Sequence, residues 1–208
     1  MTLVGHPFGS MSVVIDGKGH IEGRLAGAVA KLLLNGKKVV IVRCEGIETN
    51  GDHKFNVHKY ERFLNKTINT NPRHGQFHFR APSEMMRKAV RGMIPYKTAR
   101  GEAAFNRLEV YEGVPATYAK VSRLVIPQAL RVVSITKTRP TTTLGKLATT
   151  MGWKYSTVVE HLETKRKEAS NARWETVKAE QAKRERAIAA ANKQLGEKAV
   201  NFIENFVE

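Results

Sequence analysis

The chain has 208 residues, of which 41% are apolar and 26% charged, and its formal net charge is +16. This length and apolar content exclude a disordered chain and favour a folded core with an extension. The excess of cations indicates a polyanionic partner, first of all nucleic acid, and argues against a small-molecule substrate.

The same composition bears on the compartment. The single cysteine, Cys44, excludes an internal disulfide framework, and the apolar runs are far shorter than the roughly 20 residues that cross a membrane. The first residues lack both a basic start and an apolar segment, so no secretory signal is expected. We therefore expect a reducing, intracellular location and no membrane partner.

The N-terminal part alternates between strand and helix patterns. Residues 12–15 are a β-branched run that predicts a strand, followed by a glycine-rich loop. Apolar residues at spacings of three and four from Ile21 to Leu33 predict a helix that ends at Asn35-Gly36. Residues 38–44 form a continuous apolar run, which is typical of a strand buried on both faces.

The pattern continues toward residue 113. Residues 57–68 predict a second helix, and a third begins near Pro82 with Ser83 as candidate N-cap. A further strand is predicted over residues 107–111. Alternating strands and helices predict an α/β fold, here a three-layer α/β/α core with a mostly parallel sheet.

The charge pattern divides the rest of the chain. We expect an RNA-binding core over residues 1–118, a connecting segment over 119–146 and a long helical C-terminal extension over 147–208. The connecting segment has six Lys or Arg and no acid, whereas the extension has eleven Lys or Arg against nine Glu. A polar helix of this kind is solvated or lies along a partner. Its last turns carry an apolar stripe that we expect to meet another protein: Leu195, Ala199, Ile203 and Phe206.

The most informative stretch is 73–107, which has eight Lys or Arg, two His and only two acids. Phe77, Phe79 and Tyr96 are interleaved with the cations. Cations neutralise phosphates and aromatic faces accept unstacked bases, so this pattern predicts an RNA-binding surface, with an ordinary solvated face as the alternative. Phe77 and Phe79 either stack on bases or alternate into the core, and the sequence leaves both open.

The glycines near the start resemble a dinucleotide-binding fingerprint. Gly17 and Gly19 follow a strand and precede a helix, but the third glycine of that motif would fall at Glu22, a carboxylate where a pyrophosphate would lie. The alternative is a tight strand-to-helix turn, which leaves Lys18, His20 and Arg24 for an RNA phosphate. We favour the turn, which requires no cofactor.

Catalytic and metal-binding motifs are lacking in the sequence. It has no His-Glu-x-x-His, no cysteine pair for zinc, no Gly-x-Ser-x-Gly and no P-loop. His53 and His58 are five residues apart around a helix start, so we expect them to point to different faces. We therefore expect no enzyme, no cofactor and no bound metal.

A family resemblance accompanies these patterns. Residues 90–95 (Val-Arg-Gly-Met-Ile-Pro), then Gly101-Glu102, then residues 108–113 (Leu-Glu-Val-Tyr-Glu-Gly) resemble the signature of universal large-subunit ribosomal protein thirteen. Residues 43–47, 78–83, 97–101 and 152–155 look like its eukaryotic branch, which has a C-terminal helical extension. The resemblance is specific over 13–113 and 140–168, in order and spacing.

The resemblance implies a non-catalytic component of the cytoplasmic large ribosomal subunit that is assembled in the nucleus or nucleolus. It implies large-subunit ribosomal RNA and neighbouring ribosomal proteins as partners. An RNA-binding regulator outside the ribosome and an α/β enzyme acting on nucleotides are the rival hypotheses. The candidate RNA-binding residues are Lys18, His20, Arg24, Arg73, His74, Phe77, His78, Arg80, Arg87, Lys88, Arg91, Lys97, Arg100, Arg107, Lys120, Arg123, Lys137, Arg139, Lys146 and Lys154.

Overall fold

A computed structural model describes the backbone of residues 12–204 and the side chains of residues 12–193. The chain divides into two compact units, Met1–Glu160 and His161–Glu208. Within the described residues, no helix is long and apolar enough to span a bilayer.

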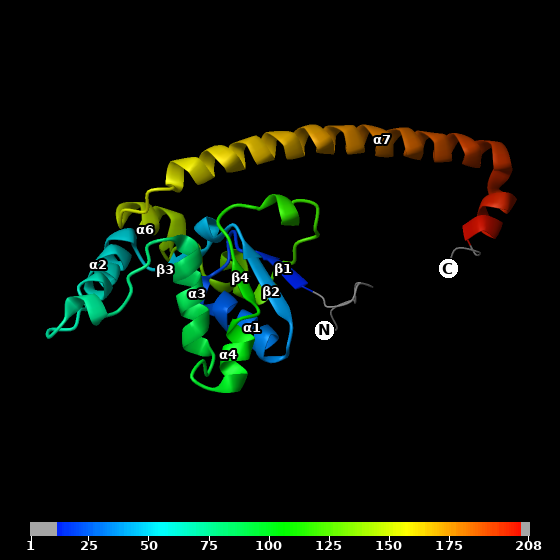
Figure 1. The fold of residues 1–208 in the computed structure, drawn as a ribbon. Helices are drawn as coiled ribbons and strands as arrows, with labels where there is room; N and C mark the ends of the chain where they lie inside the picture. The colour runs from blue at the N-terminus through cyan, green and yellow to red at the C-terminus, as the bar shows by residue number, and fades with distance from the viewer. Residues whose placement is uncertain (1–11, 205–208) are drawn as a thin grey trace. The chain divides into compact units, whose positions relative to one another are not determined.

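A parallel sheet forms the centre of the first unit (Figure 1). It contains β1 (Ser12–Asp16), β2 (Lys38–Val42) and β4 (Leu108–Val110), in the order β1-β2-β4, and both pairs of strands are parallel. This confirms the predicted α/β fold class and the parallel sheet. The strand predicted over residues 38–44 is shorter, because Arg43 adopts a left-handed conformation with φ of 58° and the 3-10 turn η1 (Cys44–Gly46) follows.

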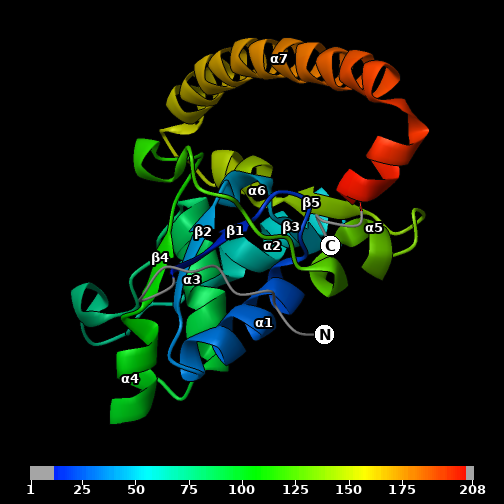
Figure 2. The ribbon, with the colours of Figure 1, turned by 90° about the vertical axis from the view of Figure 1, so that its right-hand side faces the viewer.

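Helices cover one face of the sheet (Figures 1 and 2). They are α1 (Glu22–Leu34), α3 (Pro82–Met93), α4 (Ala99–Phe105) and α6 (Leu144–Thr150). The predicted first helix is confirmed, since α1 buries Leu25, Val29 and Leu33 against the same core as Ile15 and Ile41. This apolar layer fixes the orientation of α3 and leaves its outer face free of core contacts.

The opposite face of the sheet has a smaller apolar cluster. Val14, Val40 and Val42 form its buried part. Tyr111, Val114 and Tyr118 pack against them, the last from the 3-10 turn η3 (Ala116–Tyr118). The alternation of side chains along β1 and β2 thus divides each strand between two cores, as expected of a strand buried on both sides.

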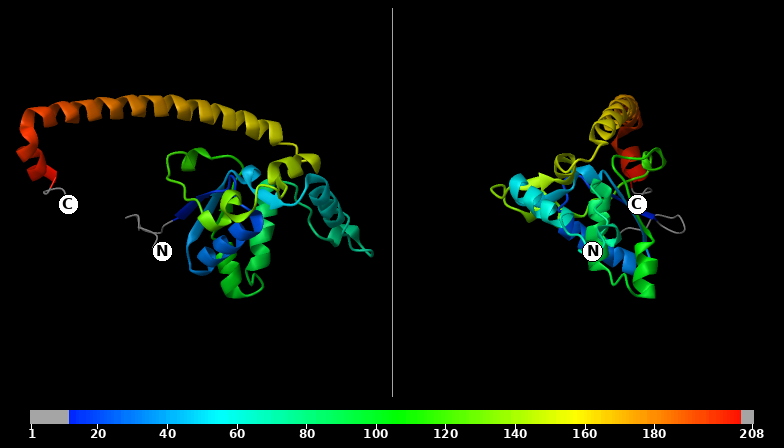
Figure 3. Two further views of the ribbon diagram at one scale, coloured as in Figure 1. Left: turned by 180° about the vertical axis from the view of Figure 1, so that it is seen from behind. Right: turned by 60° about the vertical axis from the view of Figure 1, so that its left-hand side comes forward.

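A two-stranded antiparallel sheet links distant parts of the unit (Figure 2). It pairs β3 (Glu48–Asn50) with β5 (Thr141–Thr143). Asn56 of α2 (His53–Leu64) donates from Nδ2 to Thr142 Oγ1 at 3.2 Å and so ties that helix to β5. α2 and the loop after it lie at the periphery of this unit (Figure 3).

Two predicted helix starts and one helix end need correction. α2 begins at His53 and ends at Leu64, four residues earlier at each end than predicted, because its first turn is polar and lacks the apolar spacing. α3 begins at Pro82 with Ala81 as N-cap, so Ser83 is not the cap. Ser83 instead donates from its hydroxyl and its N–H to the Glu112 carboxylate.

The basic segment over residues 119–146 packs into the first unit. Leu124 N donates to Val14 O at 2.8 Å, and Asp16 N donates to Leu124 O at 3.0 Å, which places the segment beside β1. The 3-10 turn η4 (Pro127–Ala129) and α5 (Arg131–Ser134) follow, and Ala129 is buried. The domain boundaries at residues 118 and 146 stay a prediction.

The C-terminal extension is helical, as predicted. α7 (Ser156–Glu204) has one non-helical residue, Gly196, with φ of 70° and ψ of 160°. Glu163 and Arg166 form an ion pair one turn apart, at 2.7 Å. The predicted apolar stripe lies outside the described side chains at Leu195, Ala199 and Ile203, and Phe206 lies outside the described residues altogether.

Candidate nucleic-acid interface

The outer face of α3 carries a set of cations because its inner face is buried. Met85, Met86 and Val90 point into the core. Arg87, Lys88 and Arg91 are exposed on the other side, at spacings of one and three residues. A helix turns about 100° per residue, so residues at i, i+1 and i+4 share one broad face. We call these three residues the α3 cationic face.

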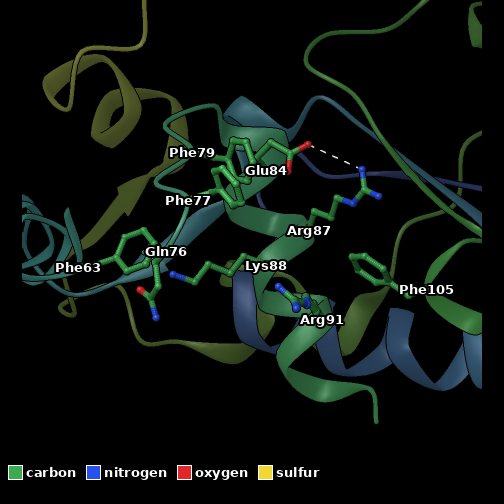
Figure 4. Close-up of a pocket in the computed structure, with 9 residues that line it drawn as sticks. All are labelled: Phe63, Gln76, Phe77, Phe79, Glu84, Arg87, Lys88, Arg91 and Phe105. Carbon is green, nitrogen blue, oxygen red and sulfur yellow. Dashed lines mark ion pairs between the residues drawn. The ribbon is translucent and has the colours of Figure 1, made fainter. Parts of the chain in front are cut away.

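Each cation of this face lies over an aromatic ring. The Lys88 ammonium is 2.9 Å from the centroid of the Phe63 ring, and the Arg91 guanidinium is 4.0 Å from that of Tyr96. The Arg87 guanidinium is 5.0 Å from the centroid of Phe105. Such contacts are worth about 0.5–1 kcal/mol each at exposed sites and restrict the orientation of the charge. Figure 4 shows Lys88 extended toward Phe63, with Arg87 and Arg91 on the side of Phe105.

A pocket of about 670 Å³ lies along the α3 cationic face and includes Phe77 and Phe79 in its wall (Figure 4). The only acid that lines it, among the described residues, is Glu84, which is 3.9 Å from Arg87. Burial, and then the nearby charge of Lys66, lowers the pKa of Lys88. The pocket therefore combines apolar walls with an excess of positive charge.

Phe77 and Phe79 are outside the core. Phe77 is 80% exposed and Phe79 is 56% exposed, and their rings stack with centroids 6.2 Å apart and planes 25° apart. The Tyr60 hydroxyl donates to the Phe79 carbonyl and holds this loop to α2. Of the two alternatives that the sequence left open, the structure shows the exposed one, while base stacking stays a prediction.

The remaining candidates of the 73–107 region divide by exposure. Arg73, His74, Arg80, Lys97 and Arg100 are exposed. His78 is half-buried with its ring edge-on to Phe63, 4.8 Å between centroids, and its Nε2 has no hydrogen-bond partner among the described residues. His78 therefore packs against Phe63, which lines this pocket.

Arg107 has a structural contact that the sequence did not indicate. Its Nη2 donates to the Leu33 carbonyl at 2.9 Å, at the C-terminal end of α1. A cation is favourable at a helix C-terminus because the last carbonyls carry partial negative charge. The half-buried Arg107 is thus committed to the fold, and we leave it out of the proposed RNA surface.

His20 also needs correction. The side chain is fully buried, and its Nε2 accepts from the Ile126 N–H at 3.0 Å. Its Nδ1 lies 3.3 Å from the Lys18 carbonyl and therefore carries the proton. A phosphate cannot reach this ring, so His20 is a core residue, whereas Lys18 and Arg24 are exposed.

The neutral state of His20 predicts a pH dependence of stability. Burial lowers the pKa of His20, despite the opposing effect of its backbone contacts. Below a pH of about 6.5, His20 binds a proton in the unfolded chain but stays neutral in the folded chain. We therefore expect the free energy of unfolding to fall by up to about 1.4 kcal/mol for each unit by which the pH is lowered. Urea titrations between pH 7.5 and 5 measure this slope. His20→Gln lacks the titrating group and should show a shallower slope, whereas an identical slope would contradict the assignment.

Packing explains the glycine at position 17, in the turn between β1 and α1. A Cβ on Gly17 would lie 3.0 Å from both the Val42 carbonyl oxygen and Ile47, so this position requires glycine for close approach. Glu22 at the start of α1 accepts from the Thr49 hydroxyl at 2.7 Å. The strand-to-helix turn that we favoured therefore accounts for both features.

The second group of candidates is spread over several elements. Lys120, Lys137, Arg139, Lys146 and Lys154 are exposed, and Arg123 is half-buried. They come from different loops and from α6, so they do not share one helix face as Arg87, Lys88 and Arg91 do. In the described part of the chain, no group of three or more His, Cys, Asp or Glu is arranged to hold a metal ion.

Comparison with known proteins identifies the family. The family model described as ribosomal protein L13 matches residues 10–117. A curated protein of Dictyostelium discoideum, named large ribosomal subunit protein uL13, is 51% identical over 164 residues, which cover 79% of this chain and 88% of that protein. The chain belongs to the ribosomal protein L13 family. This confirms the resemblance seen in the sequence, and in this L13-family chain the matched residues include the sheet, α3 and the aromatic residues around it.

Proposed function

We propose that this protein is a structural, non-catalytic component of the large ribosomal subunit that binds and stabilises large-subunit ribosomal RNA. Membership of the L13 family supports the subunit assignment. The observation that carries RNA binding is the α3 cationic face, where three exposed cations are each held over an aromatic ring.

The chemistry of this face suits a folded RNA. Arginine and lysine form charge-assisted contacts with phosphate oxygens, and guanidinium groups add planar, two-pronged contacts. Phosphate contacts of this kind position the protein without reading sequence. The exposed, stacked rings of Phe77 and Phe79 offer a platform for unstacked bases beside the charges.

The rest of the proposed RNA surface consists of exposed cations outside α3. We include Lys18, Arg24, Arg73, His74, Arg80, Lys97, Arg100, Lys120, Lys137, Arg139, Lys146 and Lys154, all of which are exposed. We propose that the protein acts in the cytoplasm after assembly in the nucleolus, and that the end of α7 meets neighbouring ribosomal proteins. No step of this role calls for a cofactor or a small-molecule substrate.

Ultraviolet crosslinking of the tagged full-length chain in cells tests the proposal. We expect the attached RNA to be large-subunit ribosomal RNA and the crosslinked peptides to fall within residues 73–107 and 119–146. Cells with an untagged copy serve as the control. Reads spread over messenger RNAs would favour an RNA-binding regulator instead, and the absence of attached RNA would overturn the proposal.

A further inference from the structure

A second pocket, of about 370 Å³, lies next to the α3 cationic face and shares five lining residues with the first: Phe63, Phe77, Phe79, Glu84 and Lys88. This volume falls within the range of about 300–1,000 Å³ that is typical of small-ligand pockets. Its inner end is formed by the buried side chains of Met85, Leu144 and Leu147. The exposed rings of Phe77 and Phe79 belong to its mouth. The flat face of a nucleobase that entered from the RNA-binding surface would therefore leave water and contact apolar and aromatic side chains.

The charged lining of this pocket consists of two carboxylates, Glu22 and Glu84, and two ammonium groups, Lys59 and Lys88. Glu22 lies at the start of α1, and the Thr49 hydroxyl donates to its Oε2 at 2.7 Å. Among the described residues, Oε1 of Glu22 receives no such bond. Burial raises the pKa of Glu22, and the charge of nearby Lys59, which also lines the pocket, opposes this. Of the two carboxylates, Glu22 is thus the one oriented by Thr49, with the charge of Lys59 nearby, whereas Glu84 pairs with Arg87 at 3.9 Å.

We propose that this pocket binds a guanine base that is extruded from the ribosomal RNA. Guanine presents two adjacent donors, N1–H and the N2 amino group, which match the two acceptor oxygens of a carboxylate, and its O6 is an acceptor for an ammonium group. Adenine and cytosine each lack this pair of adjacent donors, and uracil has no amino group. Glu22 therefore binds the Watson–Crick edge, Lys59 binds O6, and the rings of Phe77 and Phe79 border the base plane.

The cations of the α3 cationic face lie next to this pocket, where the phosphates of an extruded nucleotide would be. Lys88 lines both pockets, and Arg87 and Arg91 continue along the first one. Phosphates on either side of the extruded base would lie on these cations, which offsets the cost of unstacking. This inference rests on the proposed function, since it assigns a role to one nucleotide within the same RNA surface.

Kethoxal probing of ribosomal RNA tests the pocket directly. This dicarbonyl adds to N1 and N2 of unpaired guanines, which are the atoms assigned to Glu22. Large subunits are purified from cells in which the full-length wild type, Glu22→Gln or Glu102→Gln is the only copy of the protein. Glu102→Gln is the matched control, because Glu102 is an exposed carboxylate of α4 that lines neither of these two pockets and undergoes the same chemical change. Gln at position 22 keeps an acceptor for Thr49, so folding is preserved.

We expect one guanine that is protected in wild-type subunits to become about tenfold more reactive in Glu22→Gln subunits, with normal incorporation of the protein. The Glu102→Gln subunits should keep the wild-type pattern. The guanine assignment is overturned if no guanine changes while the protein is present in the subunits, or if dimethyl sulfate reveals a changed adenine or cytosine instead. Absence of the wild-type protein from large subunits would overturn the proposed function itself, so the two failures are distinguishable.

Discussion

Replacing both Arg87 and Arg91 by Glu is expected to exclude the protein from large ribosomal subunits. The substitution exchanges two positive charges for two negative ones on the α3 cationic face, so attraction to phosphates becomes repulsion. Each reversed contact is expected to weaken binding, and the two together by at least about a hundredfold. Sucrose-gradient sedimentation of cell extracts, with immunodetection of the tagged protein, measures the fraction in large subunits and polysomes.

The effect must be separated from misfolding. Both side chains are exposed and contribute ring contacts to Phe105 and Tyr96 and, for Arg87, an exposed ion pair with Glu84, so the free energy of unfolding in urea should change by no more than about 2 kcal/mol. The double replacement Arg87→Lys and Arg91→Lys preserves the charge and is the matched control, with most incorporation retained. Normal incorporation of the Glu variant would show that α3 does not face the RNA.

Gly101→Ala is expected to destabilise the fold more than a methyl addition at any other glycine among the described residues of the first unit. An added Cβ would overlap the carbonyl oxygen of Pro95 and lie 3.0 Å from the Tyr96 nitrogen. Both atoms are backbone, and the Thr98 side chain ties Pro95 to Gly101 by donating to Pro95 O at 2.8 Å and accepting from Gly101 N at 3.2 Å. The turn between α3 and α4 must therefore move. We expect a loss of about 3 kcal/mol in the free energy of unfolding.

Gly92→Ala is the matched control for that substitution. Gly92 lies in α3, and a Cβ there would meet no atom within 4 Å. Alanine is favoured over glycine inside a helix, so this variant should be more stable by about 0.5–1 kcal/mol. Urea unfolding of the two full-length variants measures both effects. Equal stability of Gly101→Ala and wild type would mean that the α3–α4 turn adapts without cost.

The strands and the first helix were predictable because their signals are local. β-branched runs give β1 and β2, and apolar spacing gives α1. The end of β2 was not predictable, because Arg43 is held in its left-handed conformation beside Asp16, with Nε donating to Oδ1 at 2.9 Å across 27 positions of sequence. His20 was misassigned for a similar reason: its partner Ile126 is distant in the sequence.

The candidate site was predictable in its charge but not in its construction. The density of Lys and Arg over residues 73–107 indicated the α3 cationic face, and the interleaved aromatic residues suggested a binding surface. Phe63, which lies on α2 and packs under Lys88, carried no signal, since only the packing of α2 beside α3 brings the two residues together. Glu22 appeared in the sequence only as an obstacle to a dinucleotide fingerprint, whereas the fold places it in the lining of a pocket next to this face.

The segment around Leu124 covers part of the open edge of β1. β1 is an edge strand of the three-stranded sheet, and exposed edges pair readily with other chains and aggregate. Leu124 occupies the outer hydrogen-bonding groups of Val14 and Asp16, so the C-terminal half of that edge is closed by the chain itself. The chain thus carries its own protection against edge-to-edge association along this part of β1.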